Sequence, residues 1–292
     1  MAEAGINAAL VNELRQETGA GMMDCKKALV ESGGDKGKAL EYLRKKGKAA
    51  AEKRADRSAE QGIVVIALSP DSRTGALVEL NSESDFVAKN DMFRQLAADA
   101  VNVVLEWKDA DGKPVQELLD KPMASGTKIG DALTDLIGKI GEKLQIGRFA
   151  RVHVESGMVG SYIHSDQKLG VMVVLEGPSA SNPDAAVLGR DLSMQVAASA
   201  PVVVRREEIP AEKIDSELEV EKDRARNEGK PEGAVAKIAE GRVNKWFAEV
   251  ALLEQPFVKD PKVVIRDLIA TTSKKIGGPI EVKSFVRIRV GA

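Results

Sequence analysis

Two stretches decide the fold: "GIVVIALSPDSRTGALVEL" at residues 62–80 and "GMVGSYIHSDQKLGVMVVL" at residues 157–175. Each stretch reads as an apolar run, a polar turn and a second apolar run, which predicts a β-hairpin. Each begins with a glycine and carries a second glycine at the same place, just after the polar turn. Self-similarity of this kind predicts two copies of one structural unit.

The repeat continues beyond the two hairpins. Each hairpin is followed by an Ala-rich segment with helical spacing, "MFRQLAADAVNVV" at 92–104 and "LGRDLSMQVAAS" at 188–199. Further along, "RFARVHV" at 148–154 matches "SFVRIRV" at 284–290, which predicts a third strand in each copy. The sequence therefore predicts an α+β protein whose core is two subdomains, each an antiparallel sheet backed by helices.

The two copies differ in what is inserted into them. The first contains one amphipathic helix before its third strand, with an apolar face at Ile129, Leu133, Leu136, Ile137, Ile140 and Leu144. The second contains a charged segment, the turn "EGKPEG" at 228–233, and a further helix, which together predict a helical hairpin. Its thin apolar stripe consists of Ile214, Leu218, Ala225, Val235, Ile238, Val243 and Trp246. Two interpretations stay open, since this stripe can pack on the protein's own body or on a second copy in a homodimer.

Residues 7–47 read as three short helices. On the second, Met22, Cys25, Ala28 and Leu29 fall on one side, and Asp35 is placed to cap the third. A basic, Ala-rich stretch follows at 44–57, which is either a solvated linker or helix end, or an RNA-binding segment that lacks aromatic side chains for stacking. The predicted organisation is an N-terminal three-helix domain at 1–55, subdomains at 56–155 and at 156–203 with 246–292, and the hairpin arm at 204–245.

The net charge, the cysteine count and the lack of long apolar runs limit which classes of protein this chain can belong to. The formal net charge of −2 argues against a protein built mainly to bind nucleic acid. The single cysteine, Cys25, cannot form an internal disulfide, which favours a reducing compartment. The N-terminus has no signal-peptide pattern, and no apolar run approaches the roughly 20 residues of a membrane helix. These features predict a cytoplasmic protein that does not associate with a membrane.

Few residues carry catalytic chemistry. The sequence has no phosphate-binding loop, and its two histidines, His153 and His164, lie in different predicted elements. Neither a metal site, a cofactor nor a catalytic residue is predicted. One alternative is kept open: Glu79, Glu83 and Asp85 are close in sequence and have the oxygen ligands that a magnesium-dependent hydrolase uses.

The stretch "NSESDFVAKN" at 81–90 joins a predicted strand to a predicted helix, and places Phe86 next to Asp85 in a connection expected to face water. Local structure offers one explanation: Ser84 or Asp85 caps the helix, and Phe86 packs beneath its first turn. The second copy makes the same connection through "EGPSASNPDAAV" at 176–187, without an acid–aromatic pair. The architecture does not require the pair, which points to a function of the first loop alone.

Several motifs carry a resemblance to a known family. They are "LRQETGAGMMDCKKAL" at 14–29, "SDFVAKN" at 84–90, "KIGEKL" at 139–144, "GSYIH" at 160–164, "MQVAAS" at 194–199 and "QPFVKD" at 255–260. In this order they resemble bacterial elongation factor Ts over essentially the whole chain. The resemblance implies a guanine-nucleotide exchange factor of elongation factor Tu, with a UBA-like N-terminal domain, a core of two subdomains and a helical-hairpin dimerisation arm.

The resemblance also implies which residues act. The loop containing Ser84, Asp85, Phe86 and Val87 would enter the GTPase beside its magnesium ion and phosphates, without covalent catalysis and without a cofactor. Further contacts to elongation factor Tu would come from Arg15, Met22, Met23, Ile140 and His164. There are two departures from the family: Ser84 replaces a common threonine, and the chain ends at "RVGA", where many relatives continue into a helix that packs on the GTPase. A second functional class is an RNA-associated or chaperone-like binding protein that uses the basic stretch and the hairpin.

Overall fold

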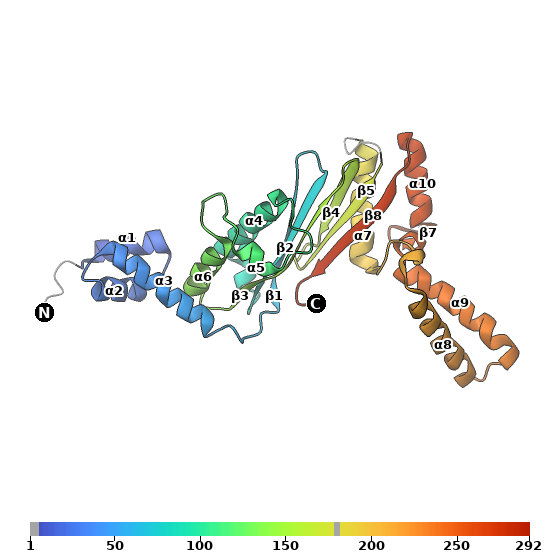
Figure 1. The fold of residues 1–292 in the computed structure, drawn as a ribbon, viewed down its shortest axis with the longest axis horizontal. Coiled ribbons are helices and arrows are strands. Elements are labelled where there is room, and N and C mark those ends of the chain that lie inside the picture. Colours follow the sequence, from blue (N-terminus) through green and yellow to red (C-terminus); the bar gives the residue numbers. More distant parts are fainter. Residues whose placement is uncertain (1–5, 178–181) are drawn as a thin grey trace. The chain divides into compact units, whose positions relative to one another are not determined.

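The computed structural model describes residues 6–177 and 182–292. The chain forms two compact units, one made of Met1–Val65, Ala76–Ala150 and Arg289–Ala292, and the other of Ile66–Gly75 and Arg151–Ile288. Both combine helices with small antiparallel sheets, which confirms the predicted α+β class (Figure 1). The domain boundaries inferred from the sequence stay a prediction.

The first unit begins with three helices, α1 (Ala8–Thr18), α2 (Met22–Glu31) and α3 (Lys36–Glu52). Asn7 caps α1, and Asp35 caps α3 as predicted, since its Oδ1 accepts a hydrogen bond from Lys38 N at 3.0 Å. Because α3 continues to Glu52, most of the basic stretch is helix rather than linker. The small core between the three helices consists of Val11, Leu14, Cys25, Ala28, Leu29 and Ala39.

A sheet of order β1-β2-β3 follows, formed by β1 (Gln61–Leu68), β2 (Thr74–Ser82) and β3 (Leu144–His153). Between β2 and β3 the chain forms α4 (Asp91–Glu106), the short α5 (Val115–Leu119) and α6 (Ile129–Ile140). Helix α3 packs on α6, and a Cβ atom on Gly138 would lie 3.2 Å from Gly47 Cα. The absence of side chains at these two positions lets the helix backbones approach closely.

The second unit repeats this arrangement with the sheet order β4-β5-β8. Its strands are β4 (Gly157–Ile163), β5 (Leu169–Glu176) and β8 (Glu281–Arg289), and helix α7 (Pro183–Ser199) packs on β4 and β5. The β4–β5 hairpin is antiparallel, with pairs running from Gly157 opposite Glu176 to Ile163 opposite Gly170, as the sequence predicts. Before β8 come the small hairpin β6 (Pro256–Phe257) and β7 (Asp260–Val264), and helix α10 (Ile265–Ile276).

The first glycine of each copy explains why the repeat is visible in the sequence. Gly62 has φ +141°, and a Cβ atom there would lie 2.1 Å from Leu80 O. Gly157 has φ +137°, and a Cβ atom there would lie 1.9 Å from Leu175 O. Only glycine tolerates both the positive φ and the close approach of the neighbouring strand. The same structural requirement therefore appears in each unit.

Helix α10 is the helix of the second copy that sequence analysis missed. It has 12 residues, as does α6, and each helix ends before a glycine in the left-handed conformation, Gly141 or Gly277. The tripeptide "KIG" at both helix ends is the signal that could have revealed it. The polar residues of "TTSKK" in the last turns of α10 weaken its apolar periodicity, so the pattern does not predict a helix there.

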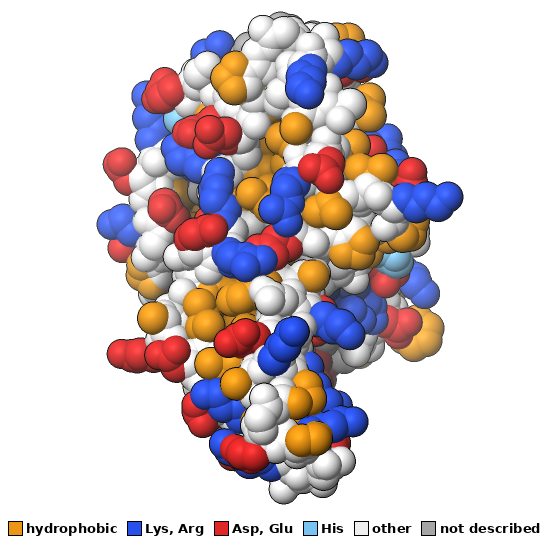
Figure 2. All heavy atoms as spheres, turned by 90° about the vertical axis from the view of Figure 1, so that its right-hand side faces the viewer, with side chains coloured by type: hydrophobic (Ala, Val, Ile, Leu, Met, Phe, Trp, Pro, Cys, Tyr) orange, Lys and Arg blue, Asp and Glu red, His pale blue; other side chains and the backbone are white. Residues whose placement is uncertain are grey.

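The predicted helical hairpin consists of α8 (Ala211–Asn227) and α9 (Glu232–Val250), which pack against each other. At its base, around the short helices η2 (Arg206–Glu208) and η3 (Leu252–Glu254), the buried residues Ile209, Val243 and Phe247 form an apolar cluster. The stripe thus packs within the hairpin and at its base, although Ile214, Leu218, Ile238 and Trp246 stay only half-buried. On the face shown in Figure 2, acidic and basic side chains alternate, with hydrophobic patches between them.

Candidate functional site

The loop between β2 and α4 presents a phenyl ring to solvent. The side chain of Phe86 is 78% exposed, whereas Phe93, in the first turn of α4, is fully buried. Directly after Phe86 the chain turns inward as the short helix η1 (Val87–Lys89), whose Val87 and Ala88 are buried. Phe86 is therefore exposed on a loop that is anchored immediately behind it.

The local explanation of this loop is wrong. The N-cap of α4 is Asn90, whose Oδ1 accepts hydrogen bonds from Met92 N and Phe93 N at 2.9 and 3.3 Å. Neither Ser84 nor Asp85 is at the cap position, and Phe86 does not pack beneath the helix. Because Asn90 satisfies the first N–H groups of α4, the loop before it is not needed to start the helix.

Asp85 is exposed beside Phe86. Its Oδ2 lies 3.9 Å from Lys89 Nζ, and the same ammonium group lies 5.9 Å from the centroid of the Phe86 ring. An exposed ion pair at this distance contributes little to stability. The carboxylate and the ring therefore form a small acidic and aromatic tip that the fold leaves accessible.

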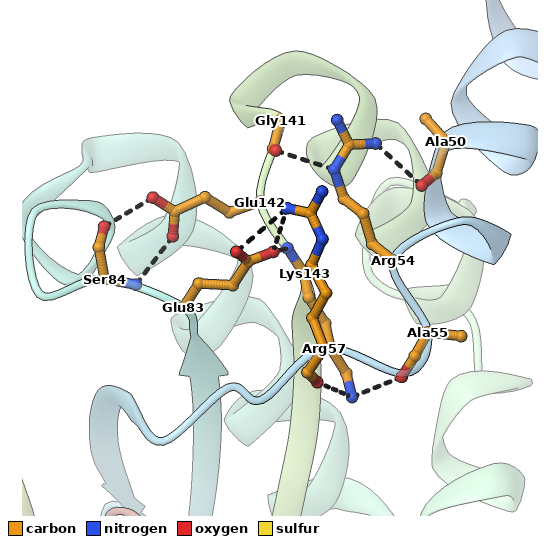
Figure 3. A network of polar contacts seen from close by, with 9 residues as sticks. All are labelled: Ala50, Arg54, Ala55, Arg57, Glu83, Ser84, Gly141, Glu142 and Lys143. Atoms are coloured by element: carbon orange, nitrogen blue, oxygen red, sulfur yellow. Dashed lines mark hydrogen bonds and ion pairs between the residues drawn. The ribbon is translucent and has the colours of Figure 1, made fainter.

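The base of the loop is held by residues from elsewhere in the same unit (Figure 3). Ser84 donates two hydrogen bonds to Glu142, from its N at 2.9 Å and from its Oγ at 2.6 Å. The carboxylate of Glu83 accepts one from Lys143 N at 2.6 Å and is paired with Arg57 at 3.2 Å. The backbone N–H of Lys143, with a smaller contribution from Arg57, lowers the pKa of Glu83, so this carboxylate is charged at neutral pH.

Sequence analysis missed Glu142, Lys143 and Arg57. The first two lie within "KIGEKL", a motif in which only Ile140 was considered. A carboxylate directly after a helix-ending glycine was the available signal, but its partner Ser84 is far away in the sequence. Pairing of this kind is set by the tertiary fold.

The N-terminal helices present a second exposed apolar surface. Met22 and Met23 begin α2 and are 49% and 73% exposed, and Arg15 is exposed on α1. Met22 lies on the same side of α2 as Cys25, Ala28 and Leu29 in the sequence pattern, but unlike them it is not part of the buried core. Gly21 is the N-cap of α2, and the first buried residue of the helix is Cys25, one turn further on.

The two other predicted contact residues lie in different units. Ile140, in the last turn of α6 in the first unit, is half-buried. His164 is exposed in the turn between β4 and β5 of the second unit, and its Nδ1 lies 3.0 Å from Asp166 Oδ1. The loop residues Ser84, Asp85, Phe86 and Val87 are thus contiguous, while Arg15, Met22, Met23, Ile140 and His164 are distributed over separate elements.

The three acids considered for a magnesium site have separate surroundings. Glu79 is buried and accepts hydrogen bonds from Arg148 Nε at 2.7 Å and Asn81 Nδ2 at 2.9 Å. Glu83 is engaged by Lys143 and Arg57, and Asp85 is exposed at the loop tip. Within residues 6–177 and 182–292, no group of three or more His, Cys, Asp or Glu side chains is arranged to hold a metal ion. In the same part of the chain, no helix is both long and apolar enough to cross a bilayer.

Comparison with known proteins adds the family. Residues 83–292 match the family described as "Elongation factor TS". The chain is 44% identical over 287 residues to "Elongation factor Ts" of Chlorobium phaeobacteroides, with 98% of this chain and 99% of that protein covered. For the protein of the same name from Desulfovibrio desulfuricans the identity is 42% over 295 residues, covering 99% of each, and for that from Clostridioides difficile it is 44% over 288 residues, covering 99% and 93%. The chain belongs to the elongation factor Ts family of translation elongation factors.

Proposed function

We propose that this chain is the guanine-nucleotide exchange factor of elongation factor Tu and that the loop of Ser84, Asp85, Phe86 and Val87 carries the activity. The observation that supports this most is the exposed Phe86 ring on an anchored loop. Burying a phenyl side chain is worth about 1.5–3 kcal/mol. A pocket in a partner protein would recover that energy, which the fold of this chain does not.

The proposed mechanism acts through the partner's magnesium ion. Phe86 would wedge beside the magnesium and phosphate site of the GTPase and bring the Asp85 carboxylate close to the ion's water shell. Magnesium tolerates little departure from octahedral geometry, so a distorted site loses the ion. The β-phosphate of GDP then lacks its main positive partner, and GDP leaves faster.

Such a factor works by binding alone. It accelerates release because it binds the empty GTPase more tightly than the loaded one, and by linkage the nucleotide weakens the factor's binding by the same ratio. Entry of GTP then releases the factor. No covalent step is required, and the cytoplasm, where translation takes place, is the proposed location.

Other parts of the chain would supply affinity. Exposed methionines adapt to irregular partner surfaces, which fits a contact through Met22 and Met23 on α2, with Arg15 contributed by α1 of the same helical domain. Ile140 and His164 are proposed as further contacts, the latter from the second unit. A homodimer through the α8–α9 hairpin stays a prediction.

The experiment is release of a fluorescent GDP analogue from elongation factor Tu, chased with unlabelled GDP, at increasing concentrations of this chain. We expect a saturable increase of at least tenfold in the release rate at millimolar magnesium. After chelation of magnesium the chain should accelerate release much less, because the ion it displaces is already absent. Unchanged release at saturating chain would refute the proposed function, and salt-sensitive RNA binding would then favour the RNA-associated alternative.

A further inference from the structure

The turn between α6 and β3 lies at the base of the exposed loop. Gly141, with φ +82°, ends α6 by donating its N–H to Ile137 O at 2.9 Å, and the chain then reverses into β3. The next two residues, Glu142 and Lys143, both reach the loop (Figure 3). A single short turn therefore holds the two residues that precede Asp85.

The two hydrogen bonds from Ser84 to Glu142 fix the orientation of Ser84. One carboxylate oxygen accepts the backbone N–H of Ser84 and the other accepts its hydroxyl, at 2.9 and 2.6 Å. Hydrogen bonds to an ionised acceptor are stronger than neutral ones, and two of them to one residue fix its orientation. The backbone that leads into Asp85 and Phe86 is thereby held at its entry.

The exit of the loop is also held. Val87 and Ala88 are buried, and Ala88 O accepts a hydrogen bond from Arg94 Nε at 3.1 Å. Between the half-buried Ser84 and the buried Val87, the two residues Asp85 and Phe86 are exposed. A segment ordered before binding loses less conformational entropy when it docks.

The segment that joins α3 to β1 holds the α6–β3 turn from the side opposite the loop. Arg54 donates from its Nε to Gly141 O at 2.9 Å, and Lys143 Nζ donates to Ala55 O and Arg57 O at 2.7 Å each. These contacts come from the segment that joins α3 to β1. They keep Glu142 in place and leave its carboxylate directed at Ser84, as Figure 3 shows.

We propose that Glu142 is a positioning residue for exchange, which acts through Ser84 by holding the Asp85–Phe86 tip in its docking orientation. This rests on the proposed function above. Glu142 is half-buried behind the loop and would not itself need to touch the nucleotide or the ion. Its loss should therefore slow the step in which the tip enters the GTPase, while the remaining contacts still bring the two proteins together.

The test compares Glu142→Ala, Glu142→Gln and Ser84→Ala with the wild-type full chain. Hydrogen–deuterium exchange of the peptide covering residues 83–90 measures loop order directly, and saturation of GDP release separates maximal rate from half-saturating concentration. For Glu142→Ala we expect faster amide exchange in this peptide and a maximal rate about tenfold lower, with the half-saturating concentration changed by less than about twofold. Glu142→Gln, which keeps one acceptor oxygen, should fall in between.

Two controls make the result decisive. Glu106→Ala removes an exposed glutamate at the end of α4 and should behave as wild type. In the double variant of Ser84→Ala and Glu142→Ala, the rate should be no lower than in Glu142→Ala alone, because both changes remove one interaction. If Glu142→Ala fails to fold, the loss of hydroxyl contact in Ser84→Ala must still raise amide exchange and lower the maximal rate by about threefold.

Wild-type amide exchange and wild-type release in both Glu142→Ala and Ser84→Ala would overturn the positioning role. Equal changes in maximal rate and half-saturating concentration, with a lowered melting temperature, would overturn it in favour of a general role in folding. If the wild-type chain itself does not accelerate GDP release, the proposed function has failed. The amide-exchange comparison then still decides whether Glu142 holds the loop.

Discussion

The loop around Phe86 and the α8–α9 hairpin both place apolar side chains among charged ones. The hairpin buries its phenylalanine, and the loop does not. In the hairpin, Phe247 is buried at the base, and Arg206 lies over its ring at 4.5 Å from the centroid. In the loop, Phe86 is exposed, and the Lys89 ammonium group lies 5.9 Å from the centroid of its ring. The hairpin buries Ala225, Val235 and Val243 of its apolar stripe, whereas the loop leaves its ring exposed on an anchored base.

The difference shows where an exposed apolar residue indicates function. A stripe with helical spacing needs a covering surface, and two antiparallel helices supply it for each other. A single ring at a loop tip has no such covering helix, and the hydrogen bonds from Ser84 to Glu142 and from Arg94 to Ala88 hold the two ends of the loop without covering the ring. We therefore expect the loop to bind a partner. The buried residues of the hairpin are already covered within the chain.

Phe247→Ala provides the largest expected effect on stability. Truncating this buried ring should lower the free energy of unfolding of the chain by about 3 kcal/mol, through lost burial and an unfilled cavity. GDP release per folded molecule should change by less than twofold. Chemical denaturation measures the first quantity and release at saturating chain the second. A large loss of exchange with unchanged stability would mean that the hairpin, and not only the loop, takes part in exchange.

Much of this fold could be predicted from the sequence, for local reasons. Gly62 and Gly157 mark the repeat because each solves the same backbone problem, and Asp35 caps α3 because the cap depends only on nearby residues. The covering of the hairpin stripe could not be predicted, because periodicity identifies a face but not what lies against it. Likewise the exposed Phe86 could be suspected from its pattern, but Glu142, which meets Ser84 only in the folded chain, could not.

Met23→Ala sharpens the comparison on the N-terminal domain. Because Met23 is exposed and outside the core of the three helices, its truncation should not change the melting temperature. If it contacts elongation factor Tu, the half-saturating concentration for GDP release should rise about fivefold, or about 1 kcal/mol, with the maximal rate unchanged. Val30→Ala, also exposed on α2 but outside the proposed contact, should be neutral. Equal effects of both variants would contradict a specific contact at Met23.

Acidic pH should produce the smallest effect, at the base of the loop. The pKa of Glu83 is lowered in the folded chain, chiefly by the Lys143 N–H, so its contribution to stability is complete above the unfolded pKa of about 4.3. That contribution is lost as the pH falls through the folded value. The stability difference between wild type and Glu83→Gln should therefore be constant from pH 6 to 8 and shrink below about pH 4. Denaturation at each pH measures it, and a difference that grows on acidification would contradict this account of Glu83.

The central claim is that Phe86 serves binding and not folding, and the most direct test is GDP release from elongation factor Tu with wild type and Phe86→Ala, beside their melting temperatures. We predict a maximal release rate about tenfold or more lower for Phe86→Ala, with a melting temperature within about 1 °C of wild type, because the exposed ring contributes little to the fold. The opposite result would contradict the account: wild-type exchange by Phe86→Ala, or a large fall in its melting temperature, would mean that the ring supports the loop's own structure.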